Sequence, residues 1–243
     1  VKLLMRRGAA ACQMGLFTEA LTDFLQANVK FQKLSGQQAS SLTGVSIETL
    51  AGDVSRLRLL VDAEALKKEG DGLFAERNTT DALLKYNAAL ALIPVHVSCL
   101  SNRAACKMAQ QDLPGCIADC STAIALLQSD SEGKYSPDGA DPAQSKKELR
   151  FDSANNVLQQ EQIKTMLFTI LPPAGSTKRS AWILKTLLRR GVALAQLNQF
   201  EAAVEDYQRA VALDPTNEAV KSDLMQIVAA RDRVAAAEAN LVQ

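Results

Sequence analysis

The stretch that decides the fold is Lys185–Pro215, KTLLRRGVALAQLNQFEAAVEDYQRAVALDP, in which small residues lie twelve and then seven positions apart. The same triplet of small residues occurs four times, at Gly8, Ala20 and Ala27, at Gly70, Ala82 and Ala89, at Ala104, Cys116 and Ala123, and at Gly191, Ala203 and Ala210. The two middle copies are 34 residues apart at each of these positions. This period is typical of helix-turn-helix repeats that stack into a solenoid, so the sequence predicts an all-α repeat fold.

The composition also favours packed helices. Hydrophobic residues make up 47% of the 243 residues, but aromatic residues only 5%. No sustained alternation of Val, Ile or Thr indicates strands, so we expect no sheet. The aromatic side chains of Phe24 and Tyr207 fall on the second helix of their hairpins and are expected in the core.

Charge and hydropathy exclude several classes of partner. The 27 basic and 27 acidic residues balance, so the overall charge gives no reason to expect nucleic acid or a membrane surface. No apolar run approaches the eighteen or so residues of a spanning helix, and we expect no membrane insertion. The chain begins in the middle of a repeat pattern, which predicts further repeats upstream of Val1.

Cysteine and histidine usage argues against a metal site and against catalysis. The five cysteines are an odd number, as expected for free thiols in a reducing, cytoplasmic compartment. Cys116 and Cys120 could suggest zinc, but there is no Cys-x-x-Cys pair, and His96 is the sole histidine. His96 lies at a hairpin exit, where a surface position is expected. With no Gly-rich phosphate loop and no nucleophile with a base, the sequence predicts a non-enzymatic protein without a cofactor or metal.

Taken in order, the chain divides into hairpins and two interruptions. Residues 1–34 are predicted as the last repeat of an upstream module, because Lys2–Ala27 matches Lys185–Ala210 at eleven of twenty-six positions. The remaining predicted segments are 35–62, a linker and the start of a long helix; 63–128, two hairpins; 129–183, an insertion with a helix at 143–170; 184–217, a third hairpin; and 218–243, a capping helix. Within the linker, 35–52 is rich in Ser, Gly, Gln and Thr and is expected to be a loop or frayed helix, whereas 53–75 reads as one helix.

The repeat pattern resembles the tetratricopeptide repeat. The matching residues are Gly70, Ala82, Tyr86, Ala89 and Pro94 in one copy and Gly191, Ala203, Tyr207, Ala210 and Pro215 in another. Within this family the chain is similar to the three-repeat modules of co-chaperones, which bind the free C-terminus of heat-shock protein 70 or 90, ending in Glu-Glu-Val-Asp. The resemblance implies a protein partner of this kind and a carboxylate clamp made by Lys67, Asp71, Asn102, Lys185 and Arg189.

The residue types at the clamp positions suit a carboxylate, with one exception. Lys185 and Arg189 are four residues apart and share a helix face, as do Lys67 and Asp71. Charge-assisted hydrogen bonds to a carboxylate are roughly twice as strong as neutral ones. Asp71 stands where the family has asparagine; an ionised aspartate cannot donate a hydrogen bond and repels the ligand, although Lys67 can neutralise it. The plain alternative is that these are solvated surface charges and that Asn102 bonds a neighbouring backbone group.

Short strings point to a narrower resemblance. The chain is similar to dynein axonemal assembly factors and sperm-associated antigen 1 in a few short segments. These are Asn102–Cys106, Cys116–Cys120, and Leu171–Pro173 ahead of Arg189–Gly191. This resemblance implies a role in ciliary dynein preassembly and a connection with the cilium. The other function that the sequence leaves open is a structural scaffold, whose groove is filled by its own insertion or by a helix of a neighbouring subunit.

Overall fold

The computed structural model describes residues 1–33, 44, 46–129, 134–135, 147–148, 165–167 and 169–241. Its helices are α1 (Lys2–Gln13), α2 (Phe17–Gln32), α4 (Ile47–Ala75), α5 (Thr79–Leu92), α6 (Val97–Ala109), α7 (Leu113–Gln128), α9 (Thr177–Gln196), α10 (Phe200–Leu213) and α11 (Glu218–Leu241). The described residues fall into two compact units. The first contains those of Val1–Gly72, Leu84–His96 and Phe151–Ile170, and the second those of Leu73–Leu83, Val97–Arg150 and Leu171–Gln243.

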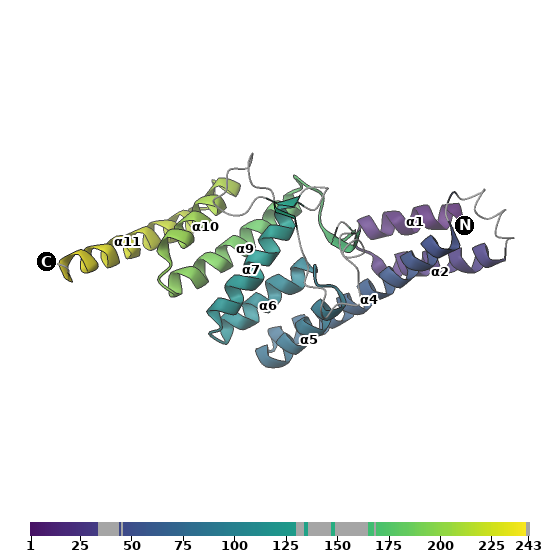
Figure 1. The fold of residues 1–243 in the computed structure, drawn as a ribbon, viewed down its shortest axis with the longest axis horizontal. Coiled ribbons are helices and arrows are strands. Elements are labelled where there is room, and N and C mark those ends of the chain that lie inside the picture. The colour runs from purple at the N-terminus through teal and green to yellow at the C-terminus, as the bar shows by residue number, and fades with distance from the viewer. Residues whose placement is uncertain are drawn as a thin grey trace. The chain divides into compact units, whose positions relative to one another are not determined.

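Helical hairpins build each unit. In the first unit α1 packs against α2, and in the second α6 packs against α7 and α9 against α10. The second unit continues from hairpin to hairpin, because α7 packs on α9 and α10 packs on α11 (Figure 1). Leu187, Tyr207, Ala210 and Val220 form a common core between α9, α10 and α11. The predicted all-α helix-turn-helix repeat fold, with a C-terminal capping helix, is confirmed.

The first small residue of each triplet makes room for a ring from the second helix. Repeat positions are numbered here after the first hairpin, so that Gly8, Gly70, Ala104 and Gly191 occupy position 8. A Cβ atom added to the glycines would lie 2.6, 2.8 and 2.7 Å from ring atoms of the residue at position 24, which is Phe24, Tyr86 and Tyr207 respectively. The third hairpin instead carries a methyl group at position 8 and the small side chain of Cys120 at position 24. A glycine at position 8 therefore accompanies a large ring at position 24, and the larger alanine at position 8 accompanies a small side chain there.

The four hairpin turns share one backbone conformation. Repeat position 15 has a positive φ in every copy, at Gly15 (78°), Arg77 (62°), Gln111 (64°) and Asn198 (57°). The next residue donates its backbone N–H to a carbonyl five residues back; Gln199 N, for example, lies 2.9 Å from Leu194 O. This is the hydrogen bond that ends a helix through a left-handed residue. Only one of the four turns uses the glycine that such a φ favours.

An ion pair between repeat positions 7 and 23 also links the two helices of every hairpin. The pairs are Arg7–Asp23, Glu69–Lys85, Arg103–Asp119 and Arg190–Asp206. The second pair has its charges exchanged. The fourth pair is the most deeply buried, with side chains 9% and 2% exposed. This pairing was not predicted, although its sixteen-residue spacing is visible in the sequence.

Helix α4 begins earlier than the sequence predicted. The helix was predicted to begin at Asp53, after a loop or frayed helix over residues 35–52. In the structure, α4 begins at Ile47. The Ser46 hydroxyl accepts a hydrogen bond from the backbone N–H of Thr49 at 3.2 Å, and Leu50 is fully buried. A capping hydroxyl and an anchored leucine therefore extend the helix. The predicted continuous helix from 53 to 75 is confirmed.

The insertion contains a short pair of strands. β1 (Lys134–Tyr135) and β2 (Lys147–Glu148) pair in antiparallel fashion, which is an exception to the predicted absence of a sheet. Strands of two residues are too short to show an alternating pattern. Most of the predicted helix 143–170 lies outside the described residues, but 165–167 and 169–170 are helical, and Met166 and Leu167 are buried.

A buried guanidinium holds both ends of the insertion. Arg179 is 8% exposed and donates hydrogen bonds to the carbonyl oxygens of Leu127 at 2.6 Å, Ser129 at 2.9 Å and Pro172 at 3.4 Å. The first two carbonyls end α7 and the third precedes α9. Carbonyls at a helix C-terminus lack partners within the helix, and a cation there is favourable. Arg179 therefore joins the two helices where the insertion leaves and re-enters the hairpin stack.

Candidate functional site

Two of the five predicted clamp residues, Lys67 and Asp71, pair with each other on α4 in the first unit. The Lys67 ammonium lies 2.8 Å from Asp71 Oδ2. The hydroxyl of Tyr86 on α5 donates to Asp71 Oδ1 at 2.7 Å. Both carboxylate oxygens of Asp71 are thus engaged within the hairpin. The pairing of Lys67 with Asp71 was predicted from their spacing, whereas the contact with Tyr86 was not.

A second acidic group, Glu64, lies two turns before Asp71 and one turn before Lys67 on the same helix. Glu64 Oε1 is 3.2 Å from Nε2 of His96, whose side chain is only 2% exposed. The expected surface position of His96 is therefore wrong, because the residue after the second helix turns back against α4. The hydrogen bond to His96 holds the pKa of Glu64 below its ordinary value, against the effect of burial, and the nearby Lys67 acts in the same direction.

The other three predicted residues lie on α6 and α9 of the second unit. The Arg189 guanidinium donates to the hydroxyl of Ser101 at 2.7 Å and also to the Ser101 carbonyl oxygen. This contact joins α9 to α6 beside Asn102, which is half-buried and has polar interactions of its own. Lys185 lies one turn before Arg189 on α9 and is exposed. The second unit therefore presents two cations and an amide on neighbouring first helices.

The structure places the predicted residues in two groups. Lys67 and Asp71 form one group, and Asn102, Lys185 and Arg189 form the other. All five lie on the first helices of their hairpins, α4, α6 and α9. Ser101 was missed by the sequence analysis, since a contact between residues 88 positions apart leaves no local pattern.

The buried cysteines are suited to packing. Cys116 and Cys120 belong to a core cluster with Ala104, Leu113 and Ala193. The hydrogen bond that the Cys120 thiol donates to Cys116, together with burial, raises the pKa of Cys120, and burial raises the pKa of Cys106 to about 11. Nucleophilic attack needs a thiolate, so these two thiols are unreactive near neutral pH. In the described part of the chain, no cluster of three or more His, Cys, Asp or Glu side chains is arranged to hold a metal ion.

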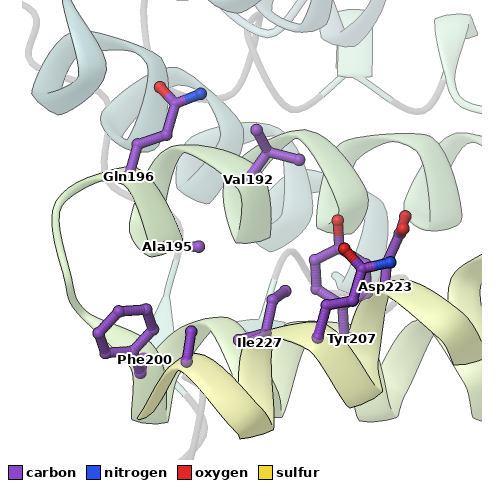
Figure 2. Close-up of a pocket in the computed structure, with 9 residues that line it drawn as sticks. Val192, Ala195, Gln196, Phe200, Tyr207, Asp223 and Ile227 are labelled. Carbon is purple, nitrogen blue, oxygen red and sulfur yellow. The ribbon is translucent and has the colours of Figure 1, made fainter. Parts of the chain in front are cut away.

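One further concavity lies beyond the predicted site. A pocket of about 410 Å³ opens between α9, α10 and α11 and is lined by Tyr207 and Asp223 among others (Figure 2). This pocket was not predicted from the sequence. A signal was available, because the residue in the fourth hairpin that corresponds to Asp71 is Val192, which cannot accept a hydrogen bond from the tyrosine at position 24. Among the helices that the structure describes, none is long and apolar enough to cross a membrane.

Comparison with known proteins agrees with the repeat pattern. The tetratricopeptide repeat family model matches residues 184–217. Dynein axonemal assembly factor 4 of Pongo pygmaeus is 27% identical over 164 residues, and that of Rattus norvegicus is 28% identical over 165 residues. These alignments cover 68% and 67% of this chain but only 28% of each relative. The chain thus corresponds to a limited part of those proteins.

Solved structures with a similar arrangement of helices include two from RPAP3. The first tetratricopeptide domain of Spaghetti (RPAP3), bound to the HSP90 peptide SRMEEVD, is 21% identical, covers 70% of this chain and 92% of its own, and has a TM-score of 0.44. The first such domain of human RPAP3 is 19% identical, covers 71% of this chain and 96% of its own, and has a TM-score of 0.45.

Proposed function

Because the chain carries tetratricopeptide repeats, we propose that it is a non-enzymatic adaptor that binds the acidic C-terminal tail of a heat-shock protein 70 or 90 chaperone. Helical repeats of this kind use extended surfaces made by successive first helices to bind other proteins. The proposed contact residues are Lys67, Asp71, Asn102, Lys185 and Arg189. The proposal assigns the clamp to these five side chains and leaves client recognition to other parts of the protein.

The observation that carries the proposal is the arrangement of Asn102, Lys185 and Arg189. Arg189 is held in place by Ser101, so part of the side-chain entropy that binding would otherwise cost is already lost in the free protein. Lys185 is exposed one turn away and can approach a second oxygen. Arg and Lys donors to a carboxylate make short, strong hydrogen bonds. A free C-terminal carboxylate, or the aspartate side chain beside it, matches these donors.

Asp71 opposes the same ligand. A carboxylate about 4 Å from a second carboxylate is repelled by about 1 kcal/mol in water-like surroundings and by about 4 kcal/mol at an effective dielectric near 20. The pairing of Asp71 with Lys67 reduces this repulsion but also occupies the lysine. We therefore expect the native chain to bind an acidic tail more weakly than a chain with asparagine at this position.

Calorimetry tests the proposal with a peptide that ends in Glu-Glu-Val-Asp with a free carboxylate. The native chain should bind it, whereas the amidated peptide and the Arg189→Ala chain should bind at least tenfold more weakly, since each change removes one charge-assisted interaction. Lys221→Ala is the matched control, because Lys221 lies on α11 and pairs with Glu218. Equal affinities for the free and amidated peptides would refute the clamp.

The Asp71→Asn variant tests the same proposal through an expected gain in peptide affinity. It removes the repulsion and adds an amide donor, so the affinity for the same peptide should rise by tenfold or more. The Tyr86 hydroxyl can still donate to the asparagine carbonyl, so the hairpin is expected to stay folded. An unchanged or lower affinity would show that Asp71 does not face the ligand.

The similarity to dynein axonemal assembly factor 4 supports a more specific role in the preassembly of ciliary dynein. Because the chain corresponds to about 28% of those relatives, this role is proposed from a partial likeness. Removal of the protein from ciliated cells should deplete axonemal dynein arms, which electron microscopy of axonemes measures. Normal dynein arms in such cells would count against this role but would leave the peptide-binding proposal standing.

A structural scaffold is the second candidate, favoured by the burial of Met166 and Leu167 within the insertion. If the insertion fills a groove of this chain, deleting residues 143–170 should expose apolar surface and lower the melting temperature and solubility. Binding of the Glu-Glu-Val-Asp peptide should then increase in the deleted chain. A deletion that leaves the melting temperature unchanged would argue against this function.

A further inference from the structure

The pocket between α9, α10 and α11 combines mainly apolar walls with the polar groups of Tyr207 and Asp223. It has a volume of about 410 Å³, within the range of ligand pockets. Its walls are mainly apolar, and its nine lining residues are Val192, Ala195 and Gln196 of α9, Phe200 and Tyr207 of α10, and Asp223, Gln226, Ile227 and Ala230 of α11. None of the five proposed clamp residues is among them, so the pocket is a separate site.

Polar and apolar groups occupy different parts of the pocket. Figure 2 shows Tyr207 and Asp223 toward one end, Phe200 toward the other, and Ile227 between them. Asp223 is the one ionisable carboxylate among the lining residues, and no lining residue is basic. Both burial and the negative charge of Asp223 raise the pKa of Tyr207, which agrees with a carboxylate close to the phenol.

The hydroxyl of Tyr207 lacks the partner that its counterpart has. In the second hairpin Tyr86 donates to Asp71 at 2.7 Å. In the fourth hairpin Val192 replaces that aspartate and cannot accept a hydrogen bond from the Tyr207 hydroxyl. The side chain is 3% exposed and lines the pocket. Tyr207 therefore places a hydroxyl that can hydrogen-bond a ligand in the wall of the pocket.

We infer that this pocket binds a lysine side chain of a partner protein, with the ammonium group at Asp223 and the Tyr207 hydroxyl and the methylene chain along Val192 and Ile227. A lysine combines a long apolar stem with a compact cation that carries three donors. The charge of the site selects against an acidic group, and the carboxylate of Asp223 gives a cation an advantage over a neutral alkyl group. The partner segment is thus basic at this point, in contrast to the acidic tail proposed for the clamp.

Nuclear magnetic resonance of the full chain with methyl labels tests the inference, with n-butylammonium as a mimic of the lysine side chain. Titration at neutral pH should shift the methyl signals of Ile227 and Val192 in a saturable manner. Because n-butanol and n-butyrate have the same stem with no charge or the opposite charge, they should bind at least tenfold more weakly. The Asp223→Asn chain should bind n-butylammonium no better than n-butanol.

Two further variants guard against indirect effects. Asp232→Asn removes a carboxylate from the same helix, where it pairs with Arg231 away from the pocket, and should leave the n-butylammonium titration unchanged. Tyr207→Phe keeps the ring and should weaken binding of the ammonium by removing one hydrogen bond. Equal binding of all three small molecules, or the absence of a saturable shift with n-butylammonium, would overturn the inference. Neither outcome bears on the Arg189 experiment, because the two sites share no residue.

Discussion

Replacement of Arg190 by methionine should destabilise the second unit strongly. Arg190 makes two hydrogen bonds to Asp206, at 2.8 and 2.6 Å, and a third to the Ser121 hydroxyl at 3.0 Å. Methionine keeps the packing of the aliphatic stem but leaves the Asp206 carboxylate, 2% exposed, without its main partner. Breaking a buried ion pair in this way costs about 3–5 kcal/mol. Arg209, 3.9 Å from Asp206, can compensate in part, so the lower end, about 3 kcal/mol, is expected.

For a chain of this size, 1 kcal/mol lowers the melting temperature by about 2–4 °C, so a loss of about 6–12 °C should follow. Thermal unfolding monitored by far-ultraviolet circular dichroism measures it. The equivalent Arg103→Met variant is the matched comparison, because Lys107 remains 3.0 Å from the Asp119 carboxylate. This variant should therefore lose clearly less stability than Arg190→Met. Equal losses, or the reverse order, would refute the reasoning that an uncompensated buried carboxylate sets the cost.

The double variant Arg190→Met/Asp206→Leu isolates the electrostatic part. Replacing both partners of a buried ion pair by apolar residues of similar volume is often neutral or stabilising. The double variant should therefore recover most of the melting temperature that Arg190→Met loses. If it remained as unstable as the single variant, lost packing rather than the unpaired carboxylate would be responsible.

Four other substitutions are expected to change stability. Gly15→Ala should cost about 1 kcal/mol in urea unfolding through its φ of 78° alone, because an added Cβ would meet nothing within 4 Å, whereas Gln111→Gly should gain about 0.5 kcal/mol. Gly191→Ala should cost about 1–3 kcal/mol, since the new methyl group would lie 2.7 Å from the ring that the glycine faces. The lowered pKa of Glu64 stabilises the native state above the unfolded pKa of about 4.5, and this contribution is lost as pH falls through the folded pKa. His96→Gln should therefore flatten the decline of unfolding free energy in that acid range, and an unchanged decline would contradict the assignment.

The hairpins could be predicted from the sequence because their determinants are local and repeated. A glycine at position 8 is required by a ring at position 24, and both lie within one hairpin. The small residue therefore recurs wherever the hairpin recurs. The turns were harder to read, since Gly15, Arg77, Gln111 and Asn198 adopt the same left-handed conformation with four different side chains. Packing of the two helices against each other fixes the backbone conformation of the turn, and the residue at position 15 adopts that conformation whatever its side chain.

Less of the candidate site could be predicted. Lys67 and Asp71 are four residues apart on one helix, so their pairing follows from the helical period. The contact of Arg189 with Ser101 and the burial of His96 depend on packing between separate helices. Such contacts leave no periodic trace in one chain. The resemblance to a known clamp identified the residue types, but the second bond to Asp71, from Tyr86, became visible only with the hairpin in three dimensions.

Arg179 has a consequence for how this protein can vary. Since one guanidinium bonds the carbonyls of Leu127, Ser129 and Pro172, the exit and entry points of the insertion are fixed next to each other. The entropy of closing a chain between fixed ends grows only slowly with its length. Relatives can therefore be expected to gain or lose residues between 130 and 164 while α7 and α9 stay in place. The same interval offers a point at which a reporter domain with neighbouring termini could be grafted into the chain.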